Sequence, residues 1–215
     1  MKRFLDFFLS VTGLLLGFPL AIMLSFLIWL QDKGLVFYFQ KRVGLKGEKF
    51  RSIQFRSMIL RAEEKSGPIQ ADLNDGRVTC IGRIIRNSAI DALPQLINIA
   101  KGDMSFVGPR ALRPEEKEVG SGKVVSVFDY PDFKERCKVR PGLTGVAQIL
   151  LPRDAPREKK FKYDIWYIKN QSFWLDFYLI ILSFLVTFQG KWETRKDKLG
   201  GLVSNLKCKV ESKIG

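Results

Sequence analysis

The sequence predicts a membrane-associated α/β (α+β) fold, in which an apolar N-terminal helix precedes a small mixed domain. Three observations support this prediction. Residues 7–30 hold no charged side chain, the middle of the chain mixes strand-like apolar runs with helical spacing, and a second apolar run covers residues 173–188. We therefore expect a membrane helix over residues 1–31, a domain over 32–190 and a basic tail over 191–215.

The composition excludes several kinds of chemistry. The chain has 215 residues, a formal net charge of +14 and no histidine, so mechanisms built on an imidazole are ruled out. Cys80, Cys137 and Cys208 lie far apart in the sequence, which argues against a disulfide framework or a zinc cluster. Carboxylates, Lys, Arg, hydroxyls or a hard metal must carry any reaction. The positive charge indicates an anionic partner: nucleic acid, a phosphorylated ligand or an acidic membrane leaflet.

The first apolar run is long enough to enter a membrane. As a helix, residues 7–30 would measure about 36 Å, against a hydrocarbon core of about 30 Å. Pro19 removes a backbone donor near its middle, and basic residues on both sides indicate two cytoplasmic flanks. Two topologies stay open on these residues: a re-entrant helix broken at Pro19, and a kinked transmembrane helix. A cleaved signal peptide fits poorly because the run is too long and lacks an A-x-A exit.

The second apolar run predicts a helix over residues 173–188. It would be about 24 Å long, too short to span, so we expect it at the membrane interface or packed on the core. Asp176, Ser183 and Thr187 would share one side of it. The tail from residue 191 holds seven Lys or Arg against three Asp or Glu, which predicts a solvated segment facing lipid headgroups, disordered at its end.

Two strands and a polar loop are expected between these helices. Residues 36–39 and 50–55 are rich in aromatic and β-branched side chains and predict strands. The polar segment from Arg61 to Asp75 leads into an Asn-Asp-Gly turn and predicts a loop or a short helix followed by a loop.

A short helix is predicted near residues 93–102. Leu93, Leu96, Ile97 and Ala100 recur at helical spacing, Pro94 suits a first turn, and Gly102 suits the position after the last turn.

Asp91 would then be the N-cap of this helix. One interpretation is that Asp91 only caps, which is worth about 1 kcal/mol. The other is that the helix terminus forms a phosphate site at which Asp91 acts, with Arg86 and Arg110 close in sequence to bind phosphate through their guanidinium groups.

Two further segments carry weaker signals. Residues 139–148 form a turn punctuated by Gly and Pro that could present backbone N–H groups to a ligand. Asp164 places a carboxylate among four aromatic residues, and a half-buried helix with a basic outer face explains this pattern equally well.

Taken together, these segments resemble the bacterial sugar transferases, the monotopic phosphoglycosyl transferases that act on polyprenyl phosphate. The matching motifs occur in the family's order: Phe39–Gly44, Phe55–Met58, Asp91–Leu96, Lys101–Ser105, Val107–Arg110, Val139–Gly145 and Tyr163–Asp164. The resemblance extends from the membrane helix to about residue 190 and leaves the tail uncovered.

The resemblance implies transfer of a sugar-1-phosphate from a UDP-sugar to polyprenyl (undecaprenyl) phosphate, which initiates surface glycan or exopolysaccharide synthesis. It implies Mg²⁺, a phosphosugar intermediate covalently bound to Asp91, and a re-entrant helix with its break at Pro19. The protein would lie in the bacterial inner membrane with its catalytic domain on the cytoplasmic face. Whether it is a homodimer stays open, and the absence of a recognisable nucleic-acid module argues against that partner.

The resemblance also implies a set of site residues. Asp91 would be the nucleophile and a metal ligand, and polar side chains would bind substrate or phosphate: Gln54, Arg56, Arg86, Arg110, Arg140, Gln148 and Asp164. Two positions depart from the family pattern. Ala92 stands where the family has Glu beside the nucleophile, and Gln54 stands where many members have Lys. The first departure predicts impaired turnover or a non-catalytic membrane-anchored scaffold that binds the same ligands.

Overall fold

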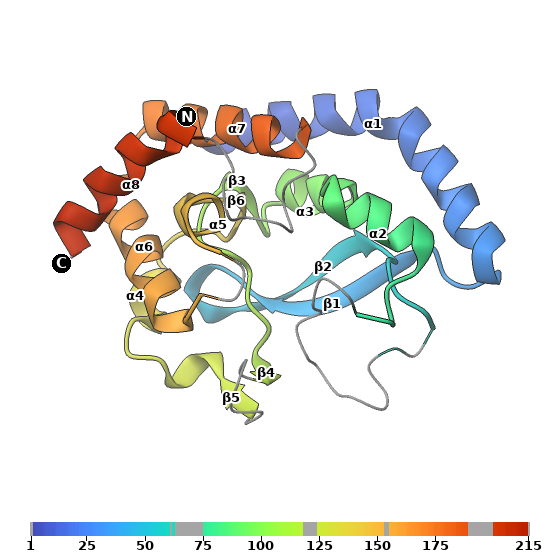
Figure 1. The fold of residues 1–215 in the computed structure, drawn as a ribbon, viewed down its shortest axis with the longest axis horizontal. Helices are drawn as coiled ribbons and strands as arrows, with labels where there is room; N and C mark the ends of the chain where they lie inside the picture. Colours follow the sequence, from blue (N-terminus) through green and yellow to red (C-terminus); the bar gives the residue numbers. More distant parts are fainter. Residues whose placement is uncertain are drawn as a thin grey trace.

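The computed structural model describes residues 2–60, 62, 75–117, 124–152, 155–188 and 200–214. It confirms the mixed α/β class and the long apolar N-terminal helix. Helix α1, Lys2–Asp32, and helix α7, Phe173–Phe188, both run along the upper edge of the view in Figure 1, with the smaller elements beneath them. The predicted loop from Arg61 to Asp75 lies almost wholly outside the described residues.

Helix α1 is continuous and contains Pro19. Figure 1 shows that it bends, so that its first part runs along the top of the molecule and its last part turns down beside α2. A proline within a helix is a common cause of such a bend. The break expected at Pro19 is therefore a bend in one helix. Among the described residues, α1 alone is long and apolar enough to cross a membrane.

The two predicted strands are confirmed and form an antiparallel hairpin. Strand β1, Phe37–Val43, pairs with strand β2, Lys49–Phe55, so that Phe37 lies opposite Phe55. The 3-10 turn η1, Leu45–Gly47, joins them and places Lys46 and Gly47 at φ of 55° and 83°. Left-handed residues of this kind allow a tight hairpin connection.

Four short strands were not predicted. Strand β3, Ser105–Val107, pairs in parallel with strand β6, Gly142–Thr144, and strand β4, Glu115–Lys117, pairs antiparallel with strand β5, Val124–Ser126. The remaining helical elements are α2 (Cys80–Asn87), η2 (Ile90–Ala92), α3 (Gln95–Lys101), η3 (Val127–Asp129), α4 (Phe133–Arg136), α5 (Val146–Leu150), α6 (Arg157–Lys169) and α8 (Gly200–Ile214).

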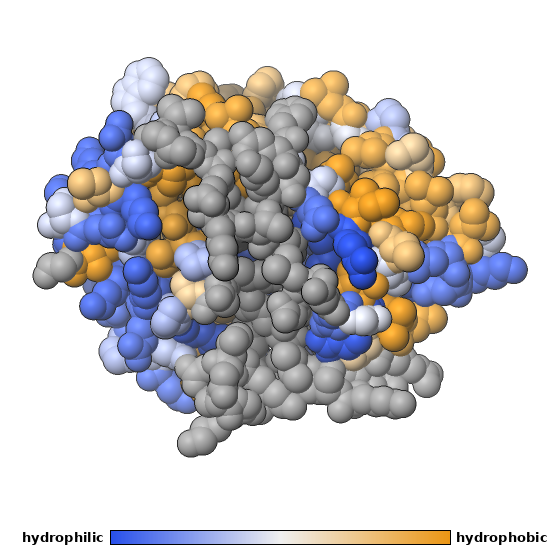
Figure 2. Space-filling model, in the orientation of Figure 1, coloured by the Kyte–Doolittle hydropathy of each residue, from blue (hydrophilic) through white to orange (hydrophobic). Residues whose placement is uncertain are grey.

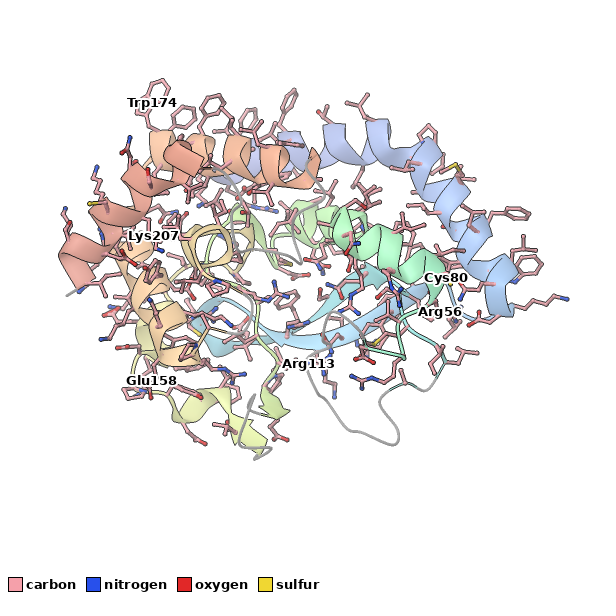
Figure 3. The ribbon with its side chains drawn as sticks, viewed as in Figure 1. Arg56, Cys80, Arg113, Glu158, Trp174 and Lys207 are labelled. Atoms are coloured by element: carbon pink, nitrogen blue, oxygen red, sulfur yellow. The ribbon has the colours of Figure 1, made fainter. Side chains whose placement is uncertain are left out.

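Helix α7 has one buried face and one exposed face. Leu179 and Leu182 are buried in the main core with side chains of α5, α6 and α8, and Val186 is also buried. Phe173 and Trp174 lie on the exposed face, and Figure 3 shows Trp174 projecting away from the domain. In Figure 2, hydrophobic colour gathers along the upper edge and the right side, where α1 and α7 lie, and hydrophilic colour dominates the left. The expectation that this helix packs on the core is confirmed, and its outer face suits an interface.

The C-terminal tail differs from its prediction. Residues 200–214 form helix α8, in which Leu206 and Val210 are buried in the same core as α7. The Tyr163 hydroxyl on α6 donates a hydrogen bond to the Glu211 carboxylate at 2.9 Å. The basic side chains of α8 are exposed, as expected for a solvated segment, but the expectation did not include the face that packs on the core. Its two apolar side chains, four residues apart, share one helix face, and the basic side chains lie on the other.

The N-terminal end of α1 is bonded to the domain. The Lys2 ammonium lies 2.8 Å from the Asp176 carboxylate on α7 and donates hydrogen bonds to the Tyr167 hydroxyl at 2.7 Å and the Val107 carbonyl at 2.9 Å. The Tyr167 hydroxyl also donates to Asp176 at 2.6 Å. Burial raises the pKa of Tyr167, and the Asp176 carboxylate adds to this rise. This network joins α1, α6, α7 and β3.

Two further contacts hold α1 on the same domain, one at its N-terminal end and one at its C-terminal end. Arg3 donates hydrogen bonds to the Ile99 and Ala100 carbonyls at the C-terminal end of α3, the latter at 2.6 Å. At the far end of α1, Asp32 forms an ion pair with Arg56, which directly follows β2. Both ends of the apolar helix therefore contact one domain.

Two glycines allow the middle of α1 to lie close to α3. A Cβ atom at Gly13 or Gly17 would come within 3.0 Å of the Leu96 or Leu93 side chain, respectively. Contacts this short are tighter than ordinary packing allows. Leu93 directly follows Ala92, so the packing of α1 bears on the backbone next to Asp91.

We expect Gly17→Leu to push α1 away from Leu93. Overpacking of this kind typically costs about 1–3 kcal/mol. The variant should unfold at a lower temperature in detergent and should bind substrate more weakly, because the turn that carries Asp91 shifts. Gly76→Leu is the control, since no atom lies within 4 Å of a Cβ at that position. Equal melting temperatures for the two variants would contradict the packing argument.

Candidate active site

One large cavity lies at the centre of the molecule. Its volume is about 1040 Å³, and α1, α2, α3, α5, α6, α7 and the β1–β2 hairpin all contribute to its lining. Part of the lining is apolar and comes from α1, the residues just before α3, α3 itself, strand β3 and α7: Leu9, Leu20, Leu93, Leu96, Phe106, Ile180 and Phe184. Another part, which we name the basic wall, is cationic: Arg42, Arg56, Arg86, Arg110, Arg113, Arg136, Arg157 and Lys160. The cavity therefore offers both an apolar and a strongly positive surface.

Asp91 lies in the turn between α2 and α3. Ala89 has a left-handed conformation, with φ of 53°, and reverses the chain before the 3-10 turn η2 that contains Asp91 and Ala92. Both residues are half-buried and line the cavity. The predicted N-cap role is wrong, because Pro94 and not Asp91 occupies the cap position of α3. Pro94 and Gly102 do mark the ends of α3, and Gly102 has φ of 101°.

The structure brings most of the predicted site residues to this cavity. Those that line it with Asp91 and Ala92 are Gln54, Arg56, Arg86, Arg110, Gln148 and Asp164. They come from β2, α2, α5, α6 and two loops, so sequence-distant motifs meet at one place. Pro19 lies next to Leu20, which also lines the cavity.

Arg140 is the exception among the predicted site residues. It is absent from the cavity lining, and its Nε donates a hydrogen bond to the Gly102 carbonyl at 2.7 Å. A cation at this place satisfies a carbonyl at the C-terminal end of α3. The structure therefore gives Arg140 a contact that stabilises the helix following Asp91, and does not place it among the cavity side chains.

Arg56 contacts α1 and also lines the cavity. It lines the cavity, is only 8% exposed, and forms the ion pair with Asp32 described above. A Cβ at Gly34 would collide with its guanidinium group, so the glycine makes room for it. Figure 3 shows Arg56 beneath α2, near the end of the hairpin. Sequence reasoning missed Asp32 as a partner because the two residues belong to different elements.

Gln148 presents an acceptor to the cavity. Its side chain is 4% exposed, its Nε2 lies 3.5 Å from the Gly142 carbonyl, and its Oε1 has no hydrogen-bond partner among the described residues. A buried acceptor without a partner is costly, so a ligand donor at this position would be stabilised. Such an acceptor suits a hydroxyl or amide N–H group better than a phosphate oxygen.

Five cations of the basic wall were not predicted as site residues: Arg42, Arg113, Arg136, Arg157 and Lys160. Figure 3 places Arg113 toward the middle of the molecule, whereas Glu158 and Lys207 lie at its edge. Arg157 and Lys160 are three apart on α6 and therefore share a face. That spacing was visible in the sequence, but the direction in which the face points was not.

Arg136 and Asp164 form a buried ion pair beside the cavity. The Arg136 Nε donates to the Asp164 carboxylate at 2.7 Å, Arg136 also donates to the Arg110 carbonyl, and the Arg136 guanidinium carbon lies 4.9 Å from the centre of the Phe161 ring. Burial raises the pKa of Asp164, and the charge of Arg136 opposes this rise. The pair holds the Arg110 segment against α6.

We expect Arg136→Met to destabilise the fold strongly. Removing one partner leaves the Asp164 carboxylate buried without its cation, which typically costs about 3–5 kcal/mol. Chemical denaturation of the detergent-solubilised protein measures this loss. Lys138→Met is the matched control, because Lys138 pairs with Glu135 at the surface and such pairs contribute about 0–1 kcal/mol. A loss for Arg136→Met no larger than for Lys138→Met would contradict this role.

The carboxylates of the cavity are the side chains that could bind a metal ion. Asp91 and Asp164 are the acidic residues of the described lining, and Asp164 is bonded to Arg136. Within the described ranges, no group of three His, Cys, Asp or Glu side chains lies close enough to hold a metal ion. A metal ion in this cavity would therefore meet few carboxylate ligands among the described residues.

Comparison with known proteins assigns the chain to a family. The sequence pattern of the family described as "bacterial sugar transferase" matches residues 1–190. The chain belongs to the bacterial sugar transferase family. All the cavity residues named above lie within the matched part, whereas helix α8 lies beyond it.

Curated bacterial sugar transferases agree with this assignment. The chain is 37% identical over 195 residues to a UDP-N-acetylgalactosamine-undecaprenyl-phosphate N-acetylgalactosaminephosphotransferase from Aeromonas hydrophila, covering 88% of this chain and 44% of that protein. It is 33% identical over 190 residues to an undecaprenyl-phosphate galactose phosphotransferase from Salmonella typhimurium, covering 82% and 38%. It is 36% identical over 193 residues to the uncharacterised sugar transferase EpsL of Bacillus subtilis, covering 85% of each chain. The chain thus spans less than half the length of the first two relatives.

Proposed function

We propose that this protein transfers a sugar-1-phosphate from a UDP-sugar to undecaprenyl phosphate and so initiates synthesis of a surface polysaccharide. The observation that carries the proposal is the central cavity, which combines Asp91 with the basic wall and an apolar lining. The names of the Aeromonas and Salmonella relatives, which specify undecaprenyl phosphate, support the acceptor class.

The cavity suits both substrates chemically. A UDP-sugar carries a diphosphate, which arginine binds in a bidentate manner. Polyprenyl phosphate has an anionic head on an apolar chain, and the cavity has apolar side chains from α1 and α7 near the same basic wall. Because α1 and α7 also carry the exposed apolar faces, a lipid could reach the cavity without leaving an apolar environment.

In the proposed reaction, Asp91 acts as a nucleophile. A carboxylate oxygen of Asp91 forms a bond to the β-phosphorus while the bond from that phosphorus to the UMP oxygen breaks, so UMP leaves with the electron pair. An oxygen of the lipid phosphate then attacks the same phosphorus and releases the Asp91 carboxylate. The basic wall neutralises the phosphate charge in both steps, and because it is fixed beforehand it costs little reorganisation.

Mg²⁺ remains part of the proposal as a partner of the nucleotide. Asp91 is the described side chain that would contact it, together with phosphate oxygens of the substrate. Bound there, the ion would supply positive charge to the leaving UMP.

We propose further that α1 enters and leaves the membrane on the cytoplasmic side of the bacterial inner membrane. A straight helix of 31 residues is about 46 Å long and would carry Lys2 and Arg3 across a core of about 30 Å. The hydrogen bonds of these two residues to Val107 and Ala100, together with the Asp32–Arg56 pair, support a placement of both ends on the side of the domain. The bend at Pro19 is compatible with such a return.

Reporter tags test this topology. Tags placed before residue 2 and after residue 215 should both be inaccessible to labelling in intact cells and accessible after permeabilisation. Pro19→Ala restores a backbone donor and should move part of the N-terminal tags outward. Labelling of the N-terminal tag in intact cells that express the parent protein would contradict the re-entrant topology.

A second candidate function rests on Ala92. Its methyl side chain cannot bind a metal or move a proton, which favours a non-catalytic membrane-anchored scaffold that binds a nucleotide sugar or lipid phosphate. UMP release, measured over a panel of UDP-sugars with undecaprenyl phosphate, separates the two functions. Release with at least one donor supports the transferase. Binding without release supports the scaffold. Membrane extraction and cross-linking of the same preparation would test the homodimer.

A further inference from the structure

The charge of the central cavity points to how a diphosphate is bound. Its described lining holds eight Lys or Arg side chains and two carboxylates. One of the carboxylates, Asp164, is 3% exposed and is held by Arg136. Such an excess of positive charge attracts an anion without help from a bridging cation.

The residue beside Asp91 strengthens this argument. Ala92 is half-buried in the 3-10 turn η2 and lines the cavity with its methyl group. A carboxylate at this position would lie next to Asp91, and two neighbouring anions repel each other and a diphosphate unless a cation lies between them. With Ala92 this local repulsion beside Asp91 is absent, so a diphosphate that approaches Asp91 meets one anion fewer.

Magnesium has few protein ligands here. Mg²⁺ in nucleotide sites is usually held by one or two carboxylates and by substrate phosphates, with several waters retained. Asp91 is the carboxylate of the cavity lining other than Asp164, and in the proposed function it must also attack phosphorus. Guanidinium groups, which are charged at any physiological pH, can instead bind phosphate oxygens directly.

We propose that this protein binds the diphosphate of its donor nucleotide through the basic wall independently of Mg²⁺, and that Ala92 is the residue that makes binding metal-independent. The inference rests on the proposed function, because it concerns the donor of that reaction. The inference concerns only the binding of the donor nucleotide. Mg²⁺ can still take part in the transfer step.

Isothermal titration with UDP tests the inference. The full-length protein in detergent is titrated once with saturating Mg²⁺ and once with EDTA. The two dissociation constants should agree within about twofold, because Arg side chains carry the binding. In the Ala92→Glu protein, EDTA should weaken UDP binding by about tenfold or more, and Mg²⁺ should restore it.

A matched pair of variants assigns the binding to the basic wall. Arg86 and Arg83 both lie on α2, but only Arg86 lines the cavity, and Arg83 is exposed. Arg86→Gln should weaken UDP binding by about tenfold with and without Mg²⁺, whereas Arg83→Gln should change it by less than about twofold.

The outcomes separate the inference from the proposed function. UDP binding by the parent that needs Mg²⁺ overturns the inference and leaves the transferase standing. Metal-independent binding in both the parent and a folded Ala92→Glu protein overturns the role given to Ala92. The absence of UDP binding under either condition overturns the inference together with the proposed function. The comparison of the parent with and without EDTA needs no variant, so misfolding of a mutant cannot obscure it.

Discussion

Asp91→Asn should abolish UMP release while leaving the fold intact. The amide has nearly the shape of the carboxylate but lacks the anionic oxygen that attacks phosphorus, so the rate should fall by at least about 10³-fold. Because Pro94 occupies the cap position of α3 and asparagine keeps the size of the aspartate side chain, this replacement should change the melting temperature by little. Initial rates of UMP release and thermal unfolding, measured on the same preparation, check both parts.

Asp132→Asn serves as the control for this prediction. Asp132 is an exposed aspartate that precedes α4 and makes no capping hydrogen bond with its side chain. It should leave both the rate and the melting temperature unchanged. A parallel loss of stability and activity in Asp91→Asn would instead indicate that Asp91 has a structural role in the η2 turn.

Ala92→Glu should raise the rate of UMP release well above that of the parent. The new carboxylate would line the cavity beside Asp91 and would add a metal ligand or a proton-handling group, which typically contributes about 10²–10⁴-fold. The gain requires Mg²⁺. Stability should fall slightly without Mg²⁺, because two neighbouring carboxylates repel each other.

Ala92→Gln separates charge from size in this prediction. It has the length of glutamate without its charge, so its rate should stay near that of the parent. If a well-folded Ala92→Glu protein and the parent are both inactive with every donor, another change such as Gln54 has disabled the site, and the scaffold function gains support.

Local patterns predicted the elements whose signal lies within one segment. The α1 and α7 helices follow from uninterrupted apolar runs, the hairpin from its strand residues, and the ends of α3 from Pro94 and Gly102. Most of the predicted site residues also line the cavity, because the motifs that contain them resemble those of a known family.

Features that depend on contacts between distant segments were not predictable in the same way. The parallel β3–β6 pair has only short strands, and its register depends on packing against α7. The ion pairs Lys2–Asp176 and Asp32–Arg56 join residues whose proximity no local pattern encodes. Asp91 was expected to cap α3, but the left-handed Ala89 moves it into a separate 3-10 turn. A left-handed alanine has no sequence signature, since glycine and asparagine are the residues typical of that conformation.

The covalent intermediate tests the central claim most directly. The protein is mixed with a UDP-sugar that supports UMP release, without lipid acceptor, then quenched and examined by intact-mass spectrometry and peptide mapping. We expect a mass increase equal to one sugar phosphate on the peptide that carries Asp91, which disappears when undecaprenyl phosphate is added. UMP release without such an adduct, or an adduct that persists in Asp91→Asn, would contradict Asp91 as the nucleophile.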